Sequence, residues 1–167
     1  MSGVNAQRGI ALLESLVALV ILALAVLGML AVQARTLAET QIGVRRGQAV
    51  RLIEDLGERI KSNPGGSAEL FRYVADWDTL PTAAANCRQT PCNAANLAAW
   101  DIANWKRHVA DALPLGKARL FAAADGRQLG VIVGWRANER DASLDARLQT
   151  DSDCPAGLTC HFAHVEP

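Results

Sequence analysis

The chain has 167 residues, with 17 basic and 17 acidic side chains and a formal net charge of zero. This length predicts one modest domain with an appended segment. The balanced charge excludes a strong general attraction to nucleic acid or to anionic lipid. The composition changes along the chain, because all four cysteines and all four tryptophans follow a long apolar run near the N-terminus.

The apolar run, residues 10–32, predicts a membrane-spanning helix. Its only charged side chain is Glu14, and Ser15 is its only other polar one. At about 1.5 Å per residue this helix is roughly 34 Å long, enough to cross a hydrocarbon core of about 30 Å. A removable secretory signal is the alternative, since Ala31 and Ala34 imitate its cleavage site, but its apolar region would be only about 7–15 residues. We therefore expect a retained span.

The residues at the start of this run form a motif. Arg8 and Gly9 precede four apolar residues that begin at Ile10, and Glu14 follows before the unbroken apolar run. This pattern resembles the leader of type IV pilins and pseudopilins. The resemblance implies that residues 1–9 are a leader, that prepilin peptidase cuts between Gly9 and Ile10, and that the new N-terminus is methylated. Ile10 departs from the pattern, in which phenylalanine is usual.

Glu14 has a physical reason to lie near the start of the helix. A carboxylate inside a membrane span costs a few kcal/mol and generally has a partner. After cleavage the amine of Ile10 would lie one helical turn away, and in a bundle it could pair with Glu14 of a neighbouring subunit. The resemblance assigns such a glutamate to the axial register between subunits. The alternative is that Glu14 lies shallow and reaches the lipid headgroups.

The helix is expected to continue beyond the span. Residues 33–62 are less apolar and predict an amphipathic continuation that lies against a globular head, residues 63–167. Ser62 to Gly66 reads Ser-Asn-Pro-Gly-Gly, which ends the helix. The expected buried stripe is Leu37, Val44, Leu52, Ile53, Leu56 and Ile60. A coiled-coil stalk is the alternative, but the stripe is too irregular for a sustained heptad.

A second helix is predicted from residue 94 or 96 to 113. Asn93 or Asn96 can cap its start, and Pro114 ends it. Its apolar residues recur three or four apart and should face the sheet or the long helix: Ala98, Ile102, Trp105, Val109 and Leu113. We interpret Trp100 and Trp105 as core residues rather than a ligand platform.

This second helix carries a further resemblance. Asp101, Ile102 and Trp105, followed by Leu113 and Pro114, are similar to the D-L-x-x-W … L-P segment of PilV-type minor pilins. The resemblance implies a minor pilin of the type IV pilus that primes assembly or forms the tip, with roles in adhesion and twitching motility. Its expected partners are other minor pilins, the major pilin, prepilin peptidase, the membrane and the inner-membrane assembly platform. It would lie in the inner membrane, head in the periplasm, and after assembly in the surface pilus.

Two other functions are kept as alternatives. A type II secretion pseudopilin shares the leader and the helix. A membrane-anchored periplasmic enzyme or metal-binding protein belongs to another class. The sequence contains no common enzyme fingerprint, and no basic stripe with interleaved aromatic residues that would indicate nucleic acid binding. We therefore predict no enzymatic activity, no cofactor and no small-molecule substrate.

Three strands complete the predicted fold. Residues 117–122 and 128–136 flank Asp125-Gly126, a good hairpin signal, and a further strand is expected at about 158–165. The second of these has one plainly apolar face. The expected fold is therefore α+β, the type IV pilin fold, with a small antiparallel sheet packed on the long N-terminal helix.

The four cysteines allow three pairings. Sequence spacing favours disulfides Cys87–Cys92 and Cys154–Cys160, which suit an oxidising compartment outside the cytoplasm. A zinc site is the alternative for the second pair, with the ligands Cys154, Cys160, His161 and His164. That cluster lacks the ligand spacing of structural zinc sites, and a strand would place the two histidines on opposite faces. A solvated acidic loop is predicted from Asp141, Asp145, Asp151 and Asp153.

Overall fold

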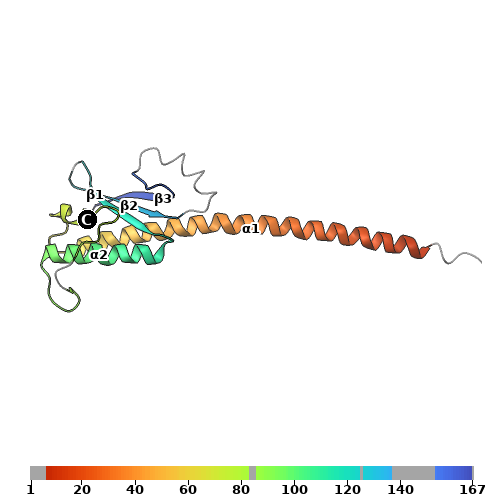
Figure 1. Ribbon diagram of the computed structural model, residues 1–167, viewed down its shortest axis with the longest axis horizontal. Helices are drawn as coiled ribbons and strands as arrows, with labels where there is room; N and C mark the ends of the chain where they lie inside the picture. Colours follow the sequence, from red (N-terminus) through yellow and green to blue (C-terminus); the bar gives the residue numbers. More distant parts are fainter. Residues whose placement is uncertain (1–6, 83–85, 125, 137–152, 167) are drawn as a thin grey trace, which may run out of the picture. The chain divides into compact units, whose positions relative to one another are not determined.

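The structure is a computed structural model of the chain, and it describes residues 7–82, 86–124, 126–136 and 153–166. The chain divides into two compact units, Met1–Gln41 and Ile42–Pro167. Helix α1 (Gln7–Ser62) supplies the described part of the first unit and continues into the second (Figure 1). A single helix over this range agrees with the sequence, because no proline interrupts it before Pro64.

The first unit consists of the apolar part of α1. Among the described residues, one helix is long and apolar enough to cross a membrane, as judged by length and composition alone. Its few hydroxyl groups are satisfied within the helix: Ser15 Oγ donates to the carbonyl of Ala11 at 2.8 Å, and Thr40 Oγ1 donates to that of Thr36 at 2.8 Å. These hydroxyl hydrogens are therefore bonded within the helix, which lowers the cost of placing them in an apolar environment.

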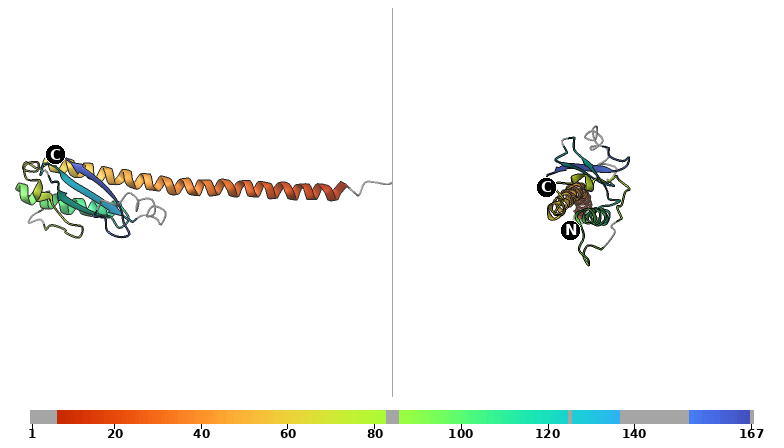
Figure 2. Two further views of the ribbon diagram at one scale, coloured as in Figure 1. Left: turned by 90° about the horizontal axis from the view of Figure 1, so that it is seen from above. Right: turned by 90° about the vertical axis from the view of Figure 1, so that its left-hand side faces the viewer.

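The second unit has two layers. One layer holds the end of α1 and helix α2 side by side, and a three-stranded antiparallel sheet of order β1-β2-β3 covers them (Figure 2). The remaining elements are the short helix η1 (Leu70–Tyr73), α2 (Ala94–Ala112), β1 (Lys117–Ala122), β2 (Leu129–Trp135) and β3 (Thr159–Val165). The predicted α+β fold is confirmed. The predicted ends of the three strands and the predicted end of α2 each lie within one residue of those observed. The start of α2, which the sequence left open between residues 94 and 96, is Ala94.

Local signals explain where α2 begins and ends. The side chain of Asn93 accepts a hydrogen bond from the backbone N–H of Asn96 at 2.8 Å, so Asn93 is the cap. Beyond the helix the chain turns tightly at Gly116, where an added Cβ would collide with the carbonyl of Val109. The hairpin residue Asp125 lies outside the described residues, while Gly126 has the positive φ of 67° that such turns require.

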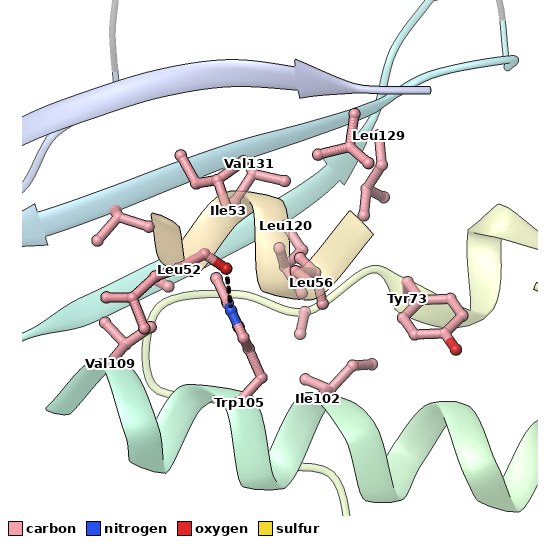
Figure 3. Close-up of a cluster of buried hydrophobic side chains, with 14 of the residues drawn as sticks. Leu52, Ile53, Leu56, Tyr73, Ile102, Trp105, Val109, Leu120, Leu129 and Val131 are labelled. Carbon is pink, nitrogen blue, oxygen red and sulfur yellow. Dashed lines mark hydrogen bonds between the residues drawn. The ribbon is translucent and has the colours of Figure 1, made fainter. Parts of the chain in front are cut away.

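The core lies between the layers (Figure 3). From α1 it takes Ala49, Leu52, Ile53, Leu56 and Ile60, and these pack against α2 and the inner face of the sheet. The predicted stripe is wrong at its N-terminal end, because Leu37 is 66% exposed and Val44 is 53% exposed. The apolar pattern of α1 extends toward the N-terminus beyond the part of the helix that the core buries, which begins at Ala49.

Strand β2 is buried on both faces, although the sequence indicated only one apolar face. All seven of its residues are buried. Ile132 faces away from the core cluster and is only 3% exposed. Gly130 lies under the ring of Phe121, since a Cβ added there would come within 3.0 Å of three ring atoms. The outer face of the sheet therefore carries its own thin apolar layer.

Candidate functional site

The first candidate site is the start of α1. The peptide between Gly9 and Ile10 lies in helical backbone, and residues 1–6 of the expected leader lie outside the described residues. Glu14 is exposed and follows Ile10 by four positions, about one helical turn. Every residue from 11 to 37 is exposed. Nothing in the described part of the chain buries these side chains, and an exposed apolar surface of this extent indicates contact with lipid or with other protein chains.

The second candidate site is the junction that holds α2 against α1. Trp105 is fully buried, and its indole Nε1–H donates to the backbone carbonyl of Leu52 at 2.6 Å (Figure 3). Apolar packing with Ile102 and Val109 surrounds the ring. The prediction of a core residue is confirmed for Trp105, whereas Trp100 is only partly buried and lies outside the core. The hydrogen bond of Trp105 also fixes the position of α2 along α1, because a donor and an acceptor must meet inside an apolar layer.

Asp101 lies one turn before Trp105 and makes the polar half of this junction. It is 7% exposed and accepts a hydrogen bond from the Tyr73 hydroxyl at 3.3 Å. Asn63 Nδ2 donates to the Tyr73 oxygen at 3.0 Å and to the Ala94 carbonyl at 2.9 Å. Arg59 approaches the other oxygen of Asp101 at 3.9 Å. The network joins the end of α1, η1 and α2 through buried polar groups that have partners.

Burial sets the ionisation of this network. It raises the pKa of Asp101, against the opposing effect of the Arg59 guanidinium. It also raises the pKa of Tyr73 to about 12, so the phenol keeps the proton that it donates. The D-x-x-x-W spacing thus places a hydrogen-bonded carboxylate and an indole on one face of α2. The sequence motif indicated a family resemblance, but it did not reveal this shared structural role.

Both predicted disulfides are present in the structure. Cys87 and Cys92 have Cα atoms 5.4 Å apart, and Cys154 and Cys160 have Cα atoms 6.0 Å apart. The first closes a loop just before α2, and the second ties the chain that precedes β3 to that strand. Each closes a short loop and restricts the unfolded chain.

The zinc alternative does not fit the geometry. The sulfurs of Cys154 and Cys160 bond to each other, so they do not act as two thiolate ligands. His164 lies at the ring of Phe162 on the outer face of the sheet, whereas His161 alternates to the opposite face. Within the described part of the chain, no group of three or more His, Cys, Asp or Glu residues could hold a metal ion. Three predicted acidic-loop residues, Asp141, Asp145 and Asp151, lie outside the described residues.

Lys106 is a buried residue that sequence reasoning missed. It is 6% exposed, and its ammonium donates to the backbone carbonyls of Asp76, of Trp77 at 3.4 Å and of Thr79 at 2.9 Å. Burial lowers the pKa of Lys106 to about 8. The sequence does contain one indication of its burial, because Lys106 lies on the apolar face of α2 next to Trp105. Lys106 therefore fixes the loop that precedes residue 80.

The chain combines an exposed apolar helix with an α+β head that contains two disulfides. This arrangement is typical of proteins whose helix is covered by lipid or by other protein chains. Residues 31–103 match the family described as "Type IV pilin Tt1218". This match supports the type IV pilin-like protein that the N-terminal motif predicted, although it does not include that motif. Comparisons with curated proteins and with solved structures gave no match. The family suggests a structural rather than an enzymatic protein, and the apolar helix is compatible with membrane anchoring and a pilus location.

Proposed function

We propose that this protein is a PilV-type minor pilin, which primes assembly of the type IV pilus or forms its tip. The observation that carries the proposal is the exposed apolar surface of α1 between residues 11 and 32. Such a surface is buried by lipid before assembly and by neighbouring subunits afterwards. The PilV type is supported by the D-x-x-x-W motif of α2, because both motif residues, Asp101 and Trp105, hold α2 against its neighbours.

The subunit is processed before it assembles. Prepilin peptidase cuts between Gly9 and Ile10 and methylates the new terminus. The cut removes Arg8 and leaves an apolar helix that begins with a cationic amine. This amine lies one turn from Glu14, close enough for pairing within one chain or between adjacent chains.

Glu14 sets the axial register of subunits in the filament. An unpaired carboxylate in an apolar bundle costs a few kcal/mol, so packing is favoured at the stagger that brings a neighbour's terminal amine to Glu14. In the precursor the span holds the protein in the inner membrane with its head in the periplasm. Its partners are other minor pilins, the major pilin, the peptidase and the assembly platform. After assembly it lies in the surface pilus and contributes to adhesion and twitching motility.

Mass spectrometry of the membrane-extracted protein tests the processing step. We expect a mature chain that starts at Ile10 and carries one methyl group. A chain that keeps Met1 in cells with an active prepilin peptidase would contradict the proposal.

The register is tested with Glu14→Ala and Glu14→Gln. Both should insert into the membrane yet fail to enter pili, because neither offers a charge to the neighbouring amine. Glu39→Ala is the matched control: Glu39 is an exposed glutamate on the same helix, paired with Arg35 at 3.1 Å, outside the apolar run. Immunoblots of sheared pili and of membranes measure both steps. Normal amounts of the Glu14 variants in pili would refute the register role.

The family description favours the pilus over a type II secretion pseudopilin, which shares the same leader and helix. A deletion strain separates the two. Lost twitching with normal exoprotein secretion supports the minor pilin, and the reverse supports the pseudopilin.

A further inference from the structure

The outer face of the sheet carries an aromatic surface that the assembly proposal does not use. We call it the aromatic face and define it as Phe121, Gly130, Ile132, Phe162 and His164. The strand register pairs Phe121 with Gly130, Gly130 with His164, and Ile132 with Phe162. Their immediate neighbours along the strands, such as Leu120, Val131 and Ala163, point into the core or pack against it. Because side chains alternate along a strand, the aromatic face is turned away from α1 and α2.

The two phenylalanine rings are nearly parallel to each other. Three ring atoms of Phe121 occupy the space that a side chain at Gly130 would need, so this ring lies across the backbone of β2. The ring of Phe162 is tilted by only 12° from it, with centroids 5.9 Å apart. Phe162 is 43% exposed, while Ile132 on the neighbouring strand β2 is only 3% exposed. Phe162 therefore presents apolar ring surface to solvent, and Phe121 beside it is partly exposed.

Polar groups stand beside the rings. The imidazole of His164 is exposed and lies at 77° to the ring of Phe162, with centroids 4.6 Å apart. Gln128 and Glu166 lie on the same face at the ends of β2 and β3, and the Gln128 amide donates a hydrogen bond to the Glu166 carboxylate. This side of the aromatic face thus offers hydrogen-bond donors and acceptors in planar groups.

The charges at the opposite side are neutralised within the protein. The Arg119 guanidinium lies 5.9 Å from the centroid of the Phe121 ring. It pairs with Asp76 at 3.4 Å and with Asp153. A polyanion such as nucleic acid needs unpaired cations, which this cation does not supply. The flat rings and the mixed polar groups instead match a neutral ligand with an apolar face and a hydroxylated edge.

We propose that the aromatic face binds a neutral oligosaccharide. One face of a pyranose ring, which carries C–H groups, packs on Phe162 and Phe121, and its hydroxyl groups bond to His164, Gln128 and Glu166. The two rings lie on the opposite side of the sheet from α1, while His164 and Glu166 also line a pocket that includes α1 residues. The inference goes beyond pilus assembly and depends only on the head.

The test uses the full chain in a zwitterionic detergent that has no sugar headgroup. Cellopentaose, chitopentaose and maltopentaose serve as probes in saturation-transfer difference NMR. We expect transfer to at least one probe, strongest on the protons of one pyranose face. Phe162→Ala should weaken binding about tenfold, because it removes a stacking partner and its buried area.

Two variants make the result specific. Phe71→Ala is the matched control, since Phe71 on η1 is 64% exposed and lies outside the aromatic face; it should bind as the unaltered chain does. Phe162→Trp keeps a flat ring and should retain binding. Absence of transfer to all three probes overturns the proposal, as does unchanged binding by Phe162→Ala with near-ultraviolet circular dichroism intact. An equal loss in Phe71→Ala also overturns it.

Discussion

Replacing Trp105 by phenylalanine should destabilise the head through two separable losses. The first is the hydrogen bond of 2.6 Å to the Leu52 carbonyl, which contributes about 1 kcal/mol. The carbonyl itself lies inside α1 and remains available to the helix, so no buried acceptor is left without a donor. The second loss is the cavity left by the smaller ring, roughly 40 Å³, which at about 24 cal/mol per Å³ costs about 1 kcal/mol. The expected total is about 2 kcal/mol.

Urea unfolding of the full chain in detergent measures this change, with near-ultraviolet circular dichroism reporting on the head. With a slope of about 1–3 kcal/mol per molar urea, the midpoint should fall by about 1 M or more. Trp100→Phe is the matched control, because Trp100 lies on the same helix but is only partly buried. Its midpoint should change little.

An equal shift of the midpoint in both variants would refute this role of Trp105. A lower slope in Trp105→Phe with an unchanged midpoint would also refute it, because the slope reports the compactness of the unfolded or folded state.

Three further predictions concern other parts of the head. Unfolded lysine keeps its proton to about pH 10.5, whereas folded Lys106 loses it near pH 8. Between these two pH values Lys106 should therefore make the unfolding free energy rise with pH, and Lys106→Met should abolish that rise. Urea unfolding of both proteins from about pH 7 to 10 measures how the unfolding free energy of each depends on pH. Replacing Cys154 and Cys160 together by serine should lower the unfolding free energy by about 2 kcal/mol, as expected for a loop this short, and a urea midpoint equal to that of the unaltered protein would contradict it. Gly130→Val should cost about 1–3 kcal/mol because its side chain displaces an aromatic ring. Gly47→Ala is its control, since nothing lies within 4 Å of an added Cβ there; thermal unfolding should separate the two.

Local signals made most of the fold predictable. The breaker at Ser62 to Gly66, the cap at Asn93 and the stop at Pro114 define helix ends through backbone chemistry that acts within a few residues. Alternating apolar residues gave the strands, and close spacing gave the two disulfides. Each of these features depends on neighbours in the sequence, which is why they can be read without the tertiary structure.

Features that depend on distant contacts were not predictable. Val44 continues the apolar periodicity of α1, but the core begins only at Ala49, and no local signal marks that boundary. The role of Asp101 requires Tyr73 and Asn63 to come from other elements. Lys106 likewise bonds to carbonyls about thirty residues earlier in the chain. The start of α1 remains a prediction at Gly9, Ile10 and Glu14, because their roles require an enzyme and neighbouring subunits.

The continuity of α1 has a mechanical consequence. A pull applied to the first unit passes along the main-chain hydrogen bonds of one helix into the turns that begin at Ala49. There the load becomes shear between α1 and α2, and the indole of Trp105 opposes sliding because its donor engages the backbone of α1 rather than a movable side chain. Short disulfide loops elsewhere in the head do not bridge this contact. Resistance of the head to traction therefore depends on the packing of α2 and the sheet against α1 rather than on its covalent cross-links.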